Sequence, residues 1–497
     1  MHVGLVYRGR YHVREALDLE TYAAILKGAG HHVSLFWDEN TFGVTDNVLQ
    51  IPRMAARLSD PDRLIAGMAE ARPDVLAFSV LPATYGWARD MARRVKDRVG
   101  APILFMGFHP SMAPERCMQD DVVDYVIEGE VEGTLPGLLE VLEGKADPAG
   151  VGNLWYRDGG AVRHTGRAPL VDMVALPLPD KELFRPRVSH GYSYCAMVSR
   201  GCPFVCTFCE ETCSKRLYGS GYFRRKAVAT VMRELTAAKR RYRFREVVFK
   251  DSYLSGNKPW LRALMRRYRR EIGVPFKCFC TIIGFDAETA RLLKEGGCYN
   301  IEFGLQTWNE SIRRDTLHRR ETNAQARRAF RICDRVRVRY DVDHMFNLPG
   351  ETAADHAAGA RAYTRLRYLC RVKNHFLLYL PKAEIVEAGK REGLLPEQVE
   401  VALADGRESD FYHQETGSPE DRATVAAYAA LYKILPLLPA RVVNWFLADG
   451  RVHRLKGIPA PLMLLLQGLI ALRAGDLRFA EYLQSYPARI LRALRGI

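Results

Sequence analysis

The chain has 497 residues, of which 48% are hydrophobic and 26% are charged. These proportions exclude a disordered or low-complexity protein, and the length predicts two or three globular domains. The longest apolar run, residues 458–472, is shorter than the ~20 residues that a membrane-spanning helix needs, and the N-terminus has no signal-peptide pattern. We therefore expect a cytoplasmic protein.

Residues 1–146 alternate between strands and helices. Apolar runs predict strands at 3–7, 32–37, 75–80, 103–106 and 123–127, and helices at 19–28, 63–71 and 88–99. This alternation predicts an α/β fold with a doubly wound, Rossmann-like parallel sheet. Ligands of such sheets bind beyond the carboxyl ends of the strands, where the loops 79–85, 107–111 and 129–132 lie.

We predict that residues 147–188 form a linker. Asp158-Gly159-Gly160 is typical of a hairpin turn. The prolines between 176 and 180 keep the backbone extended, because proline restricts both itself and the residue before it.

Three cysteines follow the next predicted strand, residues 192–198. Cys202, Cys206 and Cys209 have the spacing C-x3-C-x2-C, and thiolates are the ligands of iron–sulfur clusters. A structural zinc site is the alternative, with Cys195 or Cys213 as the fourth ligand. A disulfide is disfavoured, because eleven cysteines, an odd number, are spread through a chain without a secretory segment.

Strand–helix repeats resume from 189 to 385. Further strands are predicted at 246–249, 276–281, 299–303, 340–346 and 375–380, and their carboxyl ends carry the polar segments 250–252, 281–283, 304–307 and 347–351. Six repeats predict an open, partial barrel with its ligands at these ends. Cys278 and Cys280 are two residues apart on a predicted strand, so both side chains face the same side of it. We expect them in the core rather than as thiol hydrogen donors.

Residues 386–497 are mainly helical. Helices are predicted at 422–435, 442–448, 463–472 and 479–494, and Phe411-Tyr412-His413-Gln414 is a candidate for the mouth of the active site. We expect a helical cap on the barrel. The more specific alternative is that these helices form an apolar surface for substrate entry or contact a membrane peripherally.

The net charge of +15 permits an acidic partner such as nucleic acid or an anionic membrane. Much of it lies at 224–226, 239–245 and 266–270. Charge runs on helices are usually solvated faces, so we expect no nucleic-acid partner.

The cysteine loop resembles the signature of radical S-adenosylmethionine (SAM) enzymes, C-x3-C-x-aromatic-C, with Phe208 as the aromatic residue. The resemblance implies that Cys202, Cys206 and Cys209 bind a [4Fe-4S] cluster whose fourth iron binds SAM. It also implies that Phe208 packs beside the cluster. Asp251, Gln306 and Glu351, at the ends of later strands, are the implied SAM contacts.

The first domain resembles the cobalamin-binding domain of one class of these enzymes, through the segments 73–79, 107–115 and 123–130. The chain lacks the Asp-x-His-x-x-Gly element, so we expect no histidine on cobalt. The residues implied to contact cobalamin lie in the loops at the sheet's carboxyl edge: Ser79, Thr84, Gly107, His109, Ser111, Gly129 and Glu130.

The family resemblance implies a cobalamin-dependent radical SAM methyltransferase acting on an unactivated carbon of a small-molecule or lipid-like substrate. The resemblance implies that one electron cleaves SAM at the cluster. An external donor such as flavodoxin or ferredoxin would supply this electron. Two alternatives stay open: cyclisation, oxidation or rearrangement without methyl transfer, as in tetrapyrrole ring formation, and a cobalamin- or cluster-binding regulatory module on nucleic acid. The sequence does not identify the substrate.

Overall fold

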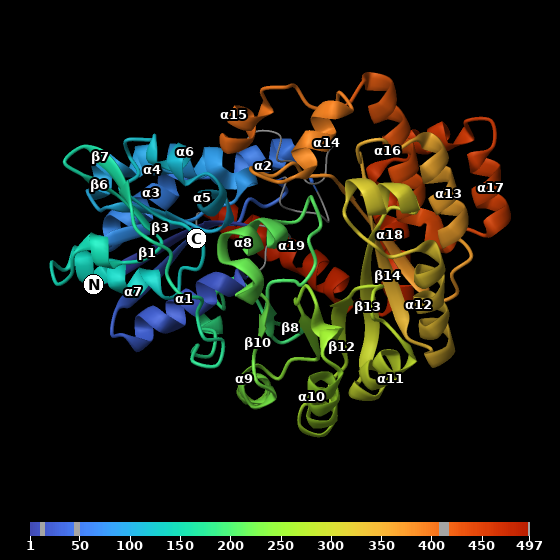
Figure 1. The fold of residues 1–497 in the computed structure, drawn as a ribbon, viewed down its shortest axis with the longest axis horizontal. Helices are drawn as coiled ribbons and strands as arrows, with labels where there is room; N and C mark the ends of the chain where they lie inside the picture. Colours follow the sequence, from blue (N-terminus) through green and yellow to red (C-terminus); the bar gives the residue numbers. More distant parts are fainter. Residues whose placement is uncertain (10–14, 44–49, 407–416, 496–497) are drawn as a thin grey trace.

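A computed structural model describes residues 1–9, 15–43, 50–406 and 417–495 of the chain (Figure 1). Two parallel sheets follow one another along the chain, and a helical region comes last. This architecture confirms the predicted α/β fold with a helical C-terminal region. The predicted aromatic cluster at 411–414 lies outside the described residues.

The first sheet has the strand order β2-β1-β3-β4-β5-β6-β7. β1 to β5 are parallel, whereas β6 and β7 add an antiparallel edge. The order of the first five strands reverses direction beside β1, which is where ligands bind in doubly wound sheets. The strands are His2–Arg8, His32–Asp38, Val75–Ser79, Ile103–Met106, Tyr125–Ile127, Leu154–Asp158 and Ala161–His164.

Helices cover both faces of this sheet, because its central strands are apolar on both sides. β3 is buried along its whole length. Two separate cores result, one against α1 and α7 and the other against α3 and α4. The helices are α1 Leu17–Gly28, α2 Pro52–Leu58, α3 Pro61–Ala71, α4 Tyr85–Val99, α5 Phe108–Met112, α6 Pro114–Met118 and α7 Thr134–Leu142.

The predicted hairpin turn joins β6 to β7. Gly159 and Gly160 adopt φ values of 54° and 87°, which the turn requires and other residues rarely adopt. The hairpin pairs with β5, so part of the segment 147–188 belongs to the first sheet.

The second sheet has six parallel strands in the order β15-β14-β13-β12-β11-β8. The strands are β8 Ser193–Ala196, β11 Glu246–Phe249, β12 Phe276–Cys280, β13 Cys298–Gln306, β14 Arg339–Phe346 and β15 Leu369–Phe376. The helices are α8 Glu210–Tyr218, α9 Val228–Tyr242, α10 Lys258–Glu271, α11 Ala287–Gly296, α12 Asn323–Val336 and α13 Ala353–Tyr363. A short ribbon pairs β9 Ser199–Arg200 with β10 Arg224–Arg225.

The prediction of the last strand at 375–380 is wrong. β15 pairs with β14 from Leu369 to Phe376. The apolar residues Leu377 and Leu380 instead follow the strand and pack in a separate cluster, where the barrel meets α14. An apolar run does not distinguish a buried strand from a buried loop.

Side chains alternate between the helix-facing side of the second sheet and its inner side. Tyr340 and Val342 pack against the helices, and so do Cys278 and Cys280, as expected. The inner side is charged. Lys277 lies 2.9 Å from Glu302 and 3.1 Å from Asp341, and all three side chains are buried.

The last quarter of the chain caps the barrel and returns to the first domain. α16 packs against β15 and α13. The helices are α14 Ile385–Arg391, α15 Val399–Ala404, α16 Pro419–Ile434, α17 Ala440–Leu447, α18 Ala460–Ala474 and α19 Leu477–Arg495. Arg371 of β15 pairs with Asp476, and Arg489 and Arg492 of α19 lie 3.4 and 3.2 Å from Glu39 of the first domain.

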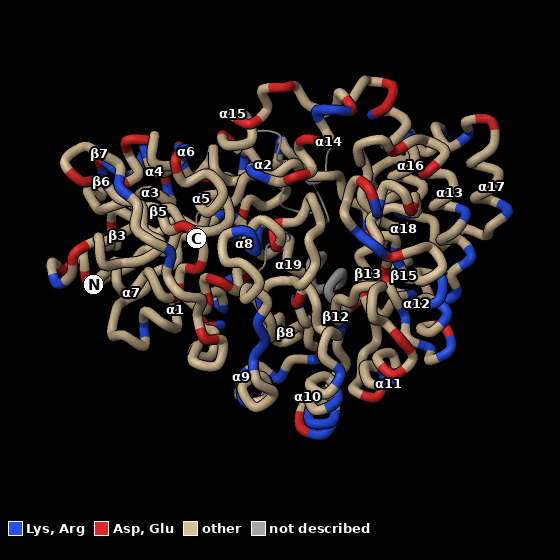
Figure 2. The backbone as a smooth tube through the Cα atoms, viewed as in Figure 1, with Lys and Arg blue, Asp and Glu red and all other residues tan. Residues whose placement is uncertain are grey.

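Lys and Arg gather on the outer helices of the barrel, α9, α10 and α12 (Figure 2). Arg240, Arg266 and Arg270 are exposed, in agreement with solvated helix faces. Among the described helices, none is by itself long and apolar enough to cross a membrane. The segments Arg451–Gly457 and Ala460–Ala474 pass that test only as a pair bent by 104°.

Candidate functional site

The cysteine loop is anchored to the carboxyl end of β11 by Asp251. Its Oδ1 accepts hydrogen bonds from the Val198 and Ser199 amides at 2.9 and 2.5 Å, and from the Ser199 hydroxyl at 2.5 Å. Burial raises the pKa of Asp251 to about 6. Its Oδ2 is buried without a hydrogen-bond partner, so one carboxylate oxygen remains available to a ligand.

Burial opposes a free thiolate at two of the three cysteines, Cys202 and Cys209. Cys206 is buried, and Cys202 and Cys209 are half-buried. Burial raises the pKa of Cys202 to about 11 and that of Cys209 well above its usual value. A bound metal centre would supply the positive charge that thiolates need here.

Arg319 adds a cation at the same place. Its Nη1 lies 3.5 Å from Cys206 Sγ, and its guanidinium also donates to Glu321 at 2.6 Å and to the Gly304 carbonyl at 2.5 Å. Arg319 therefore connects the cysteine loop to the end of β13. Arg319 was not predictable from the sequence, because no motif marks an arginine more than a hundred residues away.

The three thiols do not form a closely spaced group. In the described part of the chain, the one group of three or more His, Cys, Asp or Glu donors within 4.8 Å of each other contains none of these cysteines. Tetrahedral zinc with sulfur ligands at ~2.3 Å would hold neighbouring sulfurs about 3.8 Å apart. The thiols are therefore not drawn together as a closed zinc site would hold them.

Gln306 ends β13 in a left-handed conformation, with φ 72°. Its Oε1 is buried and has no partner, so it offers an acceptor at the same edge as Asp251. A Cβ on Gly304 would lie 2.9 Å from Gln306 Nε2, so the Gln306 amide lies directly over this glycine.

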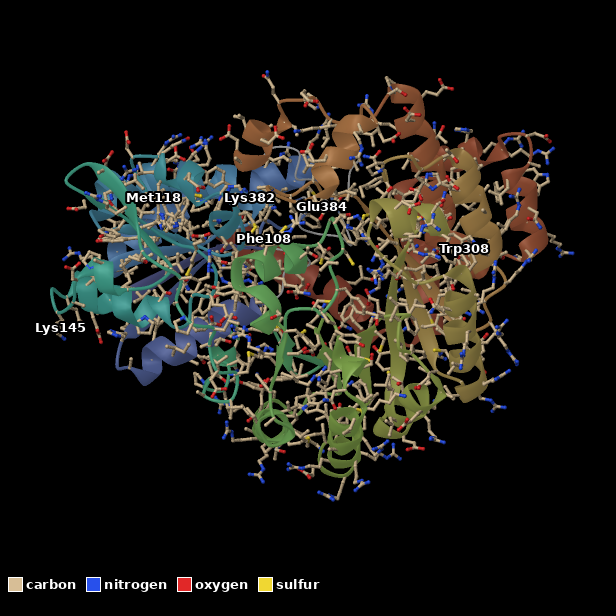
Figure 3. All side chains as sticks on the ribbon, in the orientation of Figure 1. Phe108, Met118, Lys145, Trp308, Lys382 and Glu384 are labelled. Atoms are coloured by element: carbon tan, nitrogen blue, oxygen red, sulfur yellow. The ribbon has the colours of Figure 1, made fainter. Side chains whose placement is uncertain are left out.

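The other two predicted contacts of the second domain lie apart from these acceptors. Glu351 Oε1 accepts from Thr307 Oγ1 at 2.7 Å, and its Oε2 lies 3.9 Å from His356 Nδ1. Glu351 therefore faces α13. Phe208 packs in the apolar cluster that also contains Phe108 and Met112 of the first domain. Figure 3 shows Phe108 close to Lys382 and Glu384, where the domains meet.

Ser111 ties together two loops at the carboxyl edge of the first sheet. Its hydroxyl donates to the Gly107 carbonyl at 2.7 Å and accepts from the Gly129 amide at 2.8 Å. Gly107 has φ 108°, and a Cβ there would lie 3.0 Å from the Val80 carbonyl. Thr84 accepts from the Leu81 amide at 3.0 Å, so its hydroxyl shapes the preceding turn.

His109 and Ser79 are buried at the same edge. The His109 ring stacks on Tyr85 with centroids 4.3 Å apart, and burial lowers its pKa to about 4. Neither ring nitrogen has a hydrogen-bond partner among the described residues. A polar ligand at this edge would supply one.

Glu130, the last predicted cobalamin contact, belongs to a group that we call the interdomain ion-pair cluster: Glu130, Glu132, Arg200 and Arg224. Arg224 pairs with Glu130, and Arg200 of the cysteine loop pairs with Glu132 and lies 3.5 Å from Glu130. Because Glu130 and Glu132 follow β5, this cluster joins the ligand edge of the first sheet to the cysteine loop. The sequence gives no sign of these pairs.

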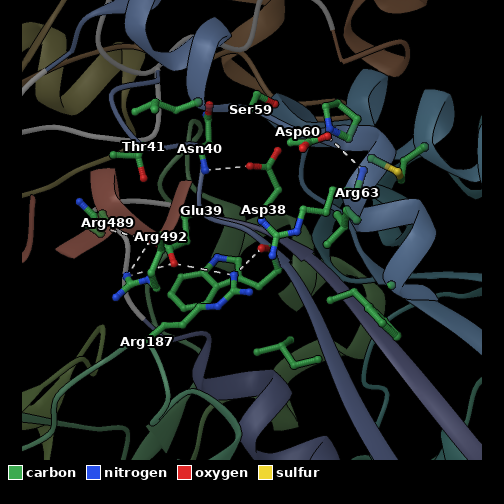
Figure 4. Close-up of a pocket in the computed structure, with 18 residues that line it drawn as sticks. Asp38, Glu39, Asn40, Thr41, Ser59, Asp60, Arg63, Arg187, Arg489 and Arg492 are labelled. Atoms are coloured by element: carbon green, nitrogen blue, oxygen red, sulfur yellow. Dashed lines mark hydrogen bonds and ion pairs between the residues drawn. The ribbon is translucent and has the colours of Figure 1, made fainter. Parts of the chain in front are cut away.

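A pocket of about 250 Å³ lies at the carboxyl end of β2 (Figure 4). Its lining includes Asp38 and Glu39, with Arg187, Arg489 and Arg492 arranged around Glu39. The pocket was not predictable from the sequence, because it forms only where α19 returns to the first domain.

Two family models match the chain. The radical SAM superfamily model matches residues 197–359, and the B12 binding domain model matches residues 11–139. The radical SAM match therefore coincides with the cysteine loop and the second sheet. The B12 match coincides with the first sheet and its ligand edge.

Two curated relatives match part of the chain. The uncharacterized methyltransferase PH0819 of Pyrococcus horikoshii is 27% identical over 247 residues, which cover 48% of this chain and 53% of the relative. The hopanoid C-3 methylase of Methylococcus capsulatus is 29% identical over 220 residues, which cover 42% of this chain and 37% of the relative. The chain thus spans about half, or less, of the length of these relatives.

A solved structure matches the fold along the whole chain. It is the radical SAM methyltransferase TsrM from Kitasatospora setae with tryptophan substrate and the SAM analogue aza-SAM bound, at a TM-score of 0.66 and 18% identity, covering 100% of this chain and 99% of that one. At this identity the likeness shows the fold alone. The chain carries a match to the B12 binding domain followed by a match to the radical SAM superfamily, and the cofactors of these domains are a [4Fe-4S] cluster, SAM and cobalamin.

Proposed function

We propose that this protein is a cobalamin-dependent radical SAM methyltransferase that methylates an unactivated carbon of a small molecule. The observation that carries the proposal is the interdomain ion-pair cluster, because Arg200 of the cysteine loop pairs with Glu132 beside the first sheet's ligand edge. The segments that follow β5 and β8 are therefore in direct contact. The two methyltransferase relatives support the same reaction class.

Each cofactor has residues that suit it. Cys202, Cys206 and Cys209 hold the cluster, and the unpartnered oxygens of Asp251 and Gln306 accept hydrogen bonds from SAM. The loops around Gly107, Ser111 and Gly129 hold cobalamin, with His109 as a polar contact. When bound, these cofactors supply the radical and the methyl group. The chain positions the reacting atoms and excludes water.

The proposed domains are cobalamin-binding at 1–146, a connecting segment at 147–188 whose β6–β7 hairpin extends the first sheet, the radical SAM barrel at 189–385 and a helical region at 386–497. A reduced flavodoxin or ferredoxin supplies the electron, and the net charge of +15 favours docking of such acidic proteins. We further propose that α17 and α18 contact a membrane surface, on the exposed apolar residues considered in the Discussion.

The test is anaerobic reconstitution with iron, sulfide and cobalamin, followed by incubation with methyl-labelled SAM, a strong reductant and candidate substrates. We expect formation of 5′-deoxyadenosine and label in the product. The variant Cys206→Ala should form neither. Failure of the reconstituted protein to release 5′-deoxyadenosine would contradict the proposal, and 5′-deoxyadenosine without label in the product would reassign the protein to oxidation or cyclisation.

A further inference from the structure

Three ionisable side chains converge between the second sheet and α13. His344 lies on β14, Glu351 in the turn that follows and His356 on α13. One ligand atom from each lies within 4.8 Å of the other two. Since Asp341 and Asp343 point to the inner side of the sheet, alternation turns His344 to the helix-facing side, away from the charged interior of the barrel.

All three residues carry a buried polar atom without a partner. His344 Nε2, Glu351 Oε2 and His356 Nδ1 make no hydrogen bond, although the three side chains are at most 2% exposed. Each such atom costs ~1–3 kcal/mol when nothing satisfies it. The 3.9 Å between Glu351 Oε2 and His356 Nδ1 is too long for a hydrogen bond between them. A cation between the three atoms would satisfy them together.

In two of these residues, His344 and Glu351, the other polar atom of the side chain already has a hydrogen-bond partner. His344 Nδ1 lies 3.1 Å from the Tyr363 hydroxyl, and Glu351 Oε1 accepts from Thr307 Oγ1 at 2.7 Å. A proton on Nδ1 directed at Tyr363 leaves the lone pair of Nε2 free to bind a metal. Metal-binding histidines and carboxylates usually have such outer partners, which fix their orientation.

We propose that His344, Glu351 and His356 bind one zinc ion. Two imidazoles and a carboxylate suit a transition metal rather than calcium or magnesium, and zinc binds such donors more tightly than iron or manganese. Zinc–nitrogen bonds of ~2.0–2.1 Å require the ligand atoms to draw together by about 1 Å, which side-chain rotation provides. The remaining position would hold a water molecule.

The charges of the site agree with a bound cation. Burial raises the pKa of Glu351 to about 8 and lowers that of His356 to about 4. A divalent ion would stabilise the ionised carboxylate and needs neutral imidazoles. The ion would clamp the turn 348–351 to α13. The proposal is independent of methyl transfer.

Zinc and iron are measured per chain in the anaerobically purified, cluster-reconstituted protein. We expect about one zinc per chain beside the roughly four irons of the cluster. His344→Gln and the isosteric Glu351→Gln should lower zinc at least tenfold and leave the iron content unchanged, so that iron reports on correct folding. His190→Gln, at another fully buried histidine, should keep its zinc.

X-ray absorption at the zinc edge of the wild-type protein gives a test without any variant. We expect nitrogen and oxygen ligands at ~2.0–2.1 Å and no sulfur. Absence of zinc from the wild-type protein, sulfur ligands on zinc, or zinc retained in both variants would overturn the proposal. If the wild-type protein holds iron beyond the roughly four of the cluster, and His344→Gln and Glu351→Gln lose that excess, the site binds iron and the choice of zinc is overturned.

Discussion

Arg319 approaches Cys206, a proposed ligand of the cluster, with Nη1 3.5 Å from Cys206 Sγ. A reduced cluster carries one more negative charge, which a nearby guanidinium and its hydrogen bond stabilise. We therefore predict that Arg319→Met lowers the cluster's midpoint potential by tens of millivolts, whereas Arg319→Lys, which keeps the charge, lowers it less. Redox titration followed by electron paramagnetic resonance measures the shift. An unchanged potential in Arg319→Met with full iron content would contradict this role.

His109 should make the stability of the chain depend on pH. Burial lowers its pKa from 6.5 to about 4, so below pH 6.5 the unfolded chain binds a proton that the folded chain excludes. Stability falls as the pH drops from 6.5 toward 4. Between pH 7 and 5 the loss from this group is about 2 kcal/mol. Urea unfolding of cobalamin-free protein should show a smaller loss in His109→Gln, and equal losses would exclude His109 as the cause.

At the scale of elements, Gly129 makes the turn after β5 possible. Its φ is 98°, and a Cβ there would lie 2.0 Å from the Tyr218 hydroxyl. Gly159, in the β6–β7 turn, also has positive φ but has open space around it. We predict that Gly129→Ala lowers the free energy of unfolding by ~2–4 kcal/mol and Gly159→Ala by ~1 kcal/mol. Thermal unfolding compares them, and similar losses would show that crowding by Tyr218 is unimportant.

Most strands were predictable because their residues are apolar and bounded by turn formers. β3, for example, is the run Val75–Ser79, after Pro73-Asp74. The last strand was misplaced, because Arg371, Lys373 and His375 break the apolar pattern of β15. These polar side chains point into the barrel, where Glu302 accepts a hydrogen bond from Lys373 at 2.5 Å. A single sequence does not show such pairing.

The candidate site was predictable where chemistry depends on local spacing and not where it depends on packing. The three cysteines lie within one loop, so their spacing reveals them. Asp251 and Gln306 were predictable because each comes just after the carboxyl end of a predicted strand. The direction of the Glu351 side chain, toward His356 rather than toward Gln306, depends on the turn's geometry. The interdomain ion-pair cluster depends on how two domains dock.

At the scale of the whole molecule, α18 presents an apolar face to solvent. The helix is apolar on all sides, and Ile470 and Ala471 are buried against the protein. Its outer leucines follow a helical 3-4-3 spacing and are 46–80% exposed: Leu462, Leu465, Leu469 and Leu472. Such a face needs an apolar partner.

The surroundings of this face favour an anionic lipid surface. Trp445 of α17 is 45% exposed, and Arg451 and Arg454 lie over its ring at 5.1 and 5.7 Å. Lys456 comes shortly before α18, and Arg473 lies in its last turn. Exposed leucines and tryptophan bordered by cations are the pattern of a helix that lies in the membrane interface.

We predict that the protein sediments with vesicles containing phosphatidylglycerol and not with pure phosphatidylcholine vesicles, because the cations need anionic lipid. The double variant Leu465→Glu/Leu472→Glu should bind about tenfold less and keep its thermal stability, since both side chains face solvent. Val162→Glu, at an exposed residue of β7, is the matched control and should bind as the wild type does. Equal binding by the double variant would contradict membrane contact. If light scattering instead shows a dimer that the double variant loses, the face belongs to an interface between two copies of the chain.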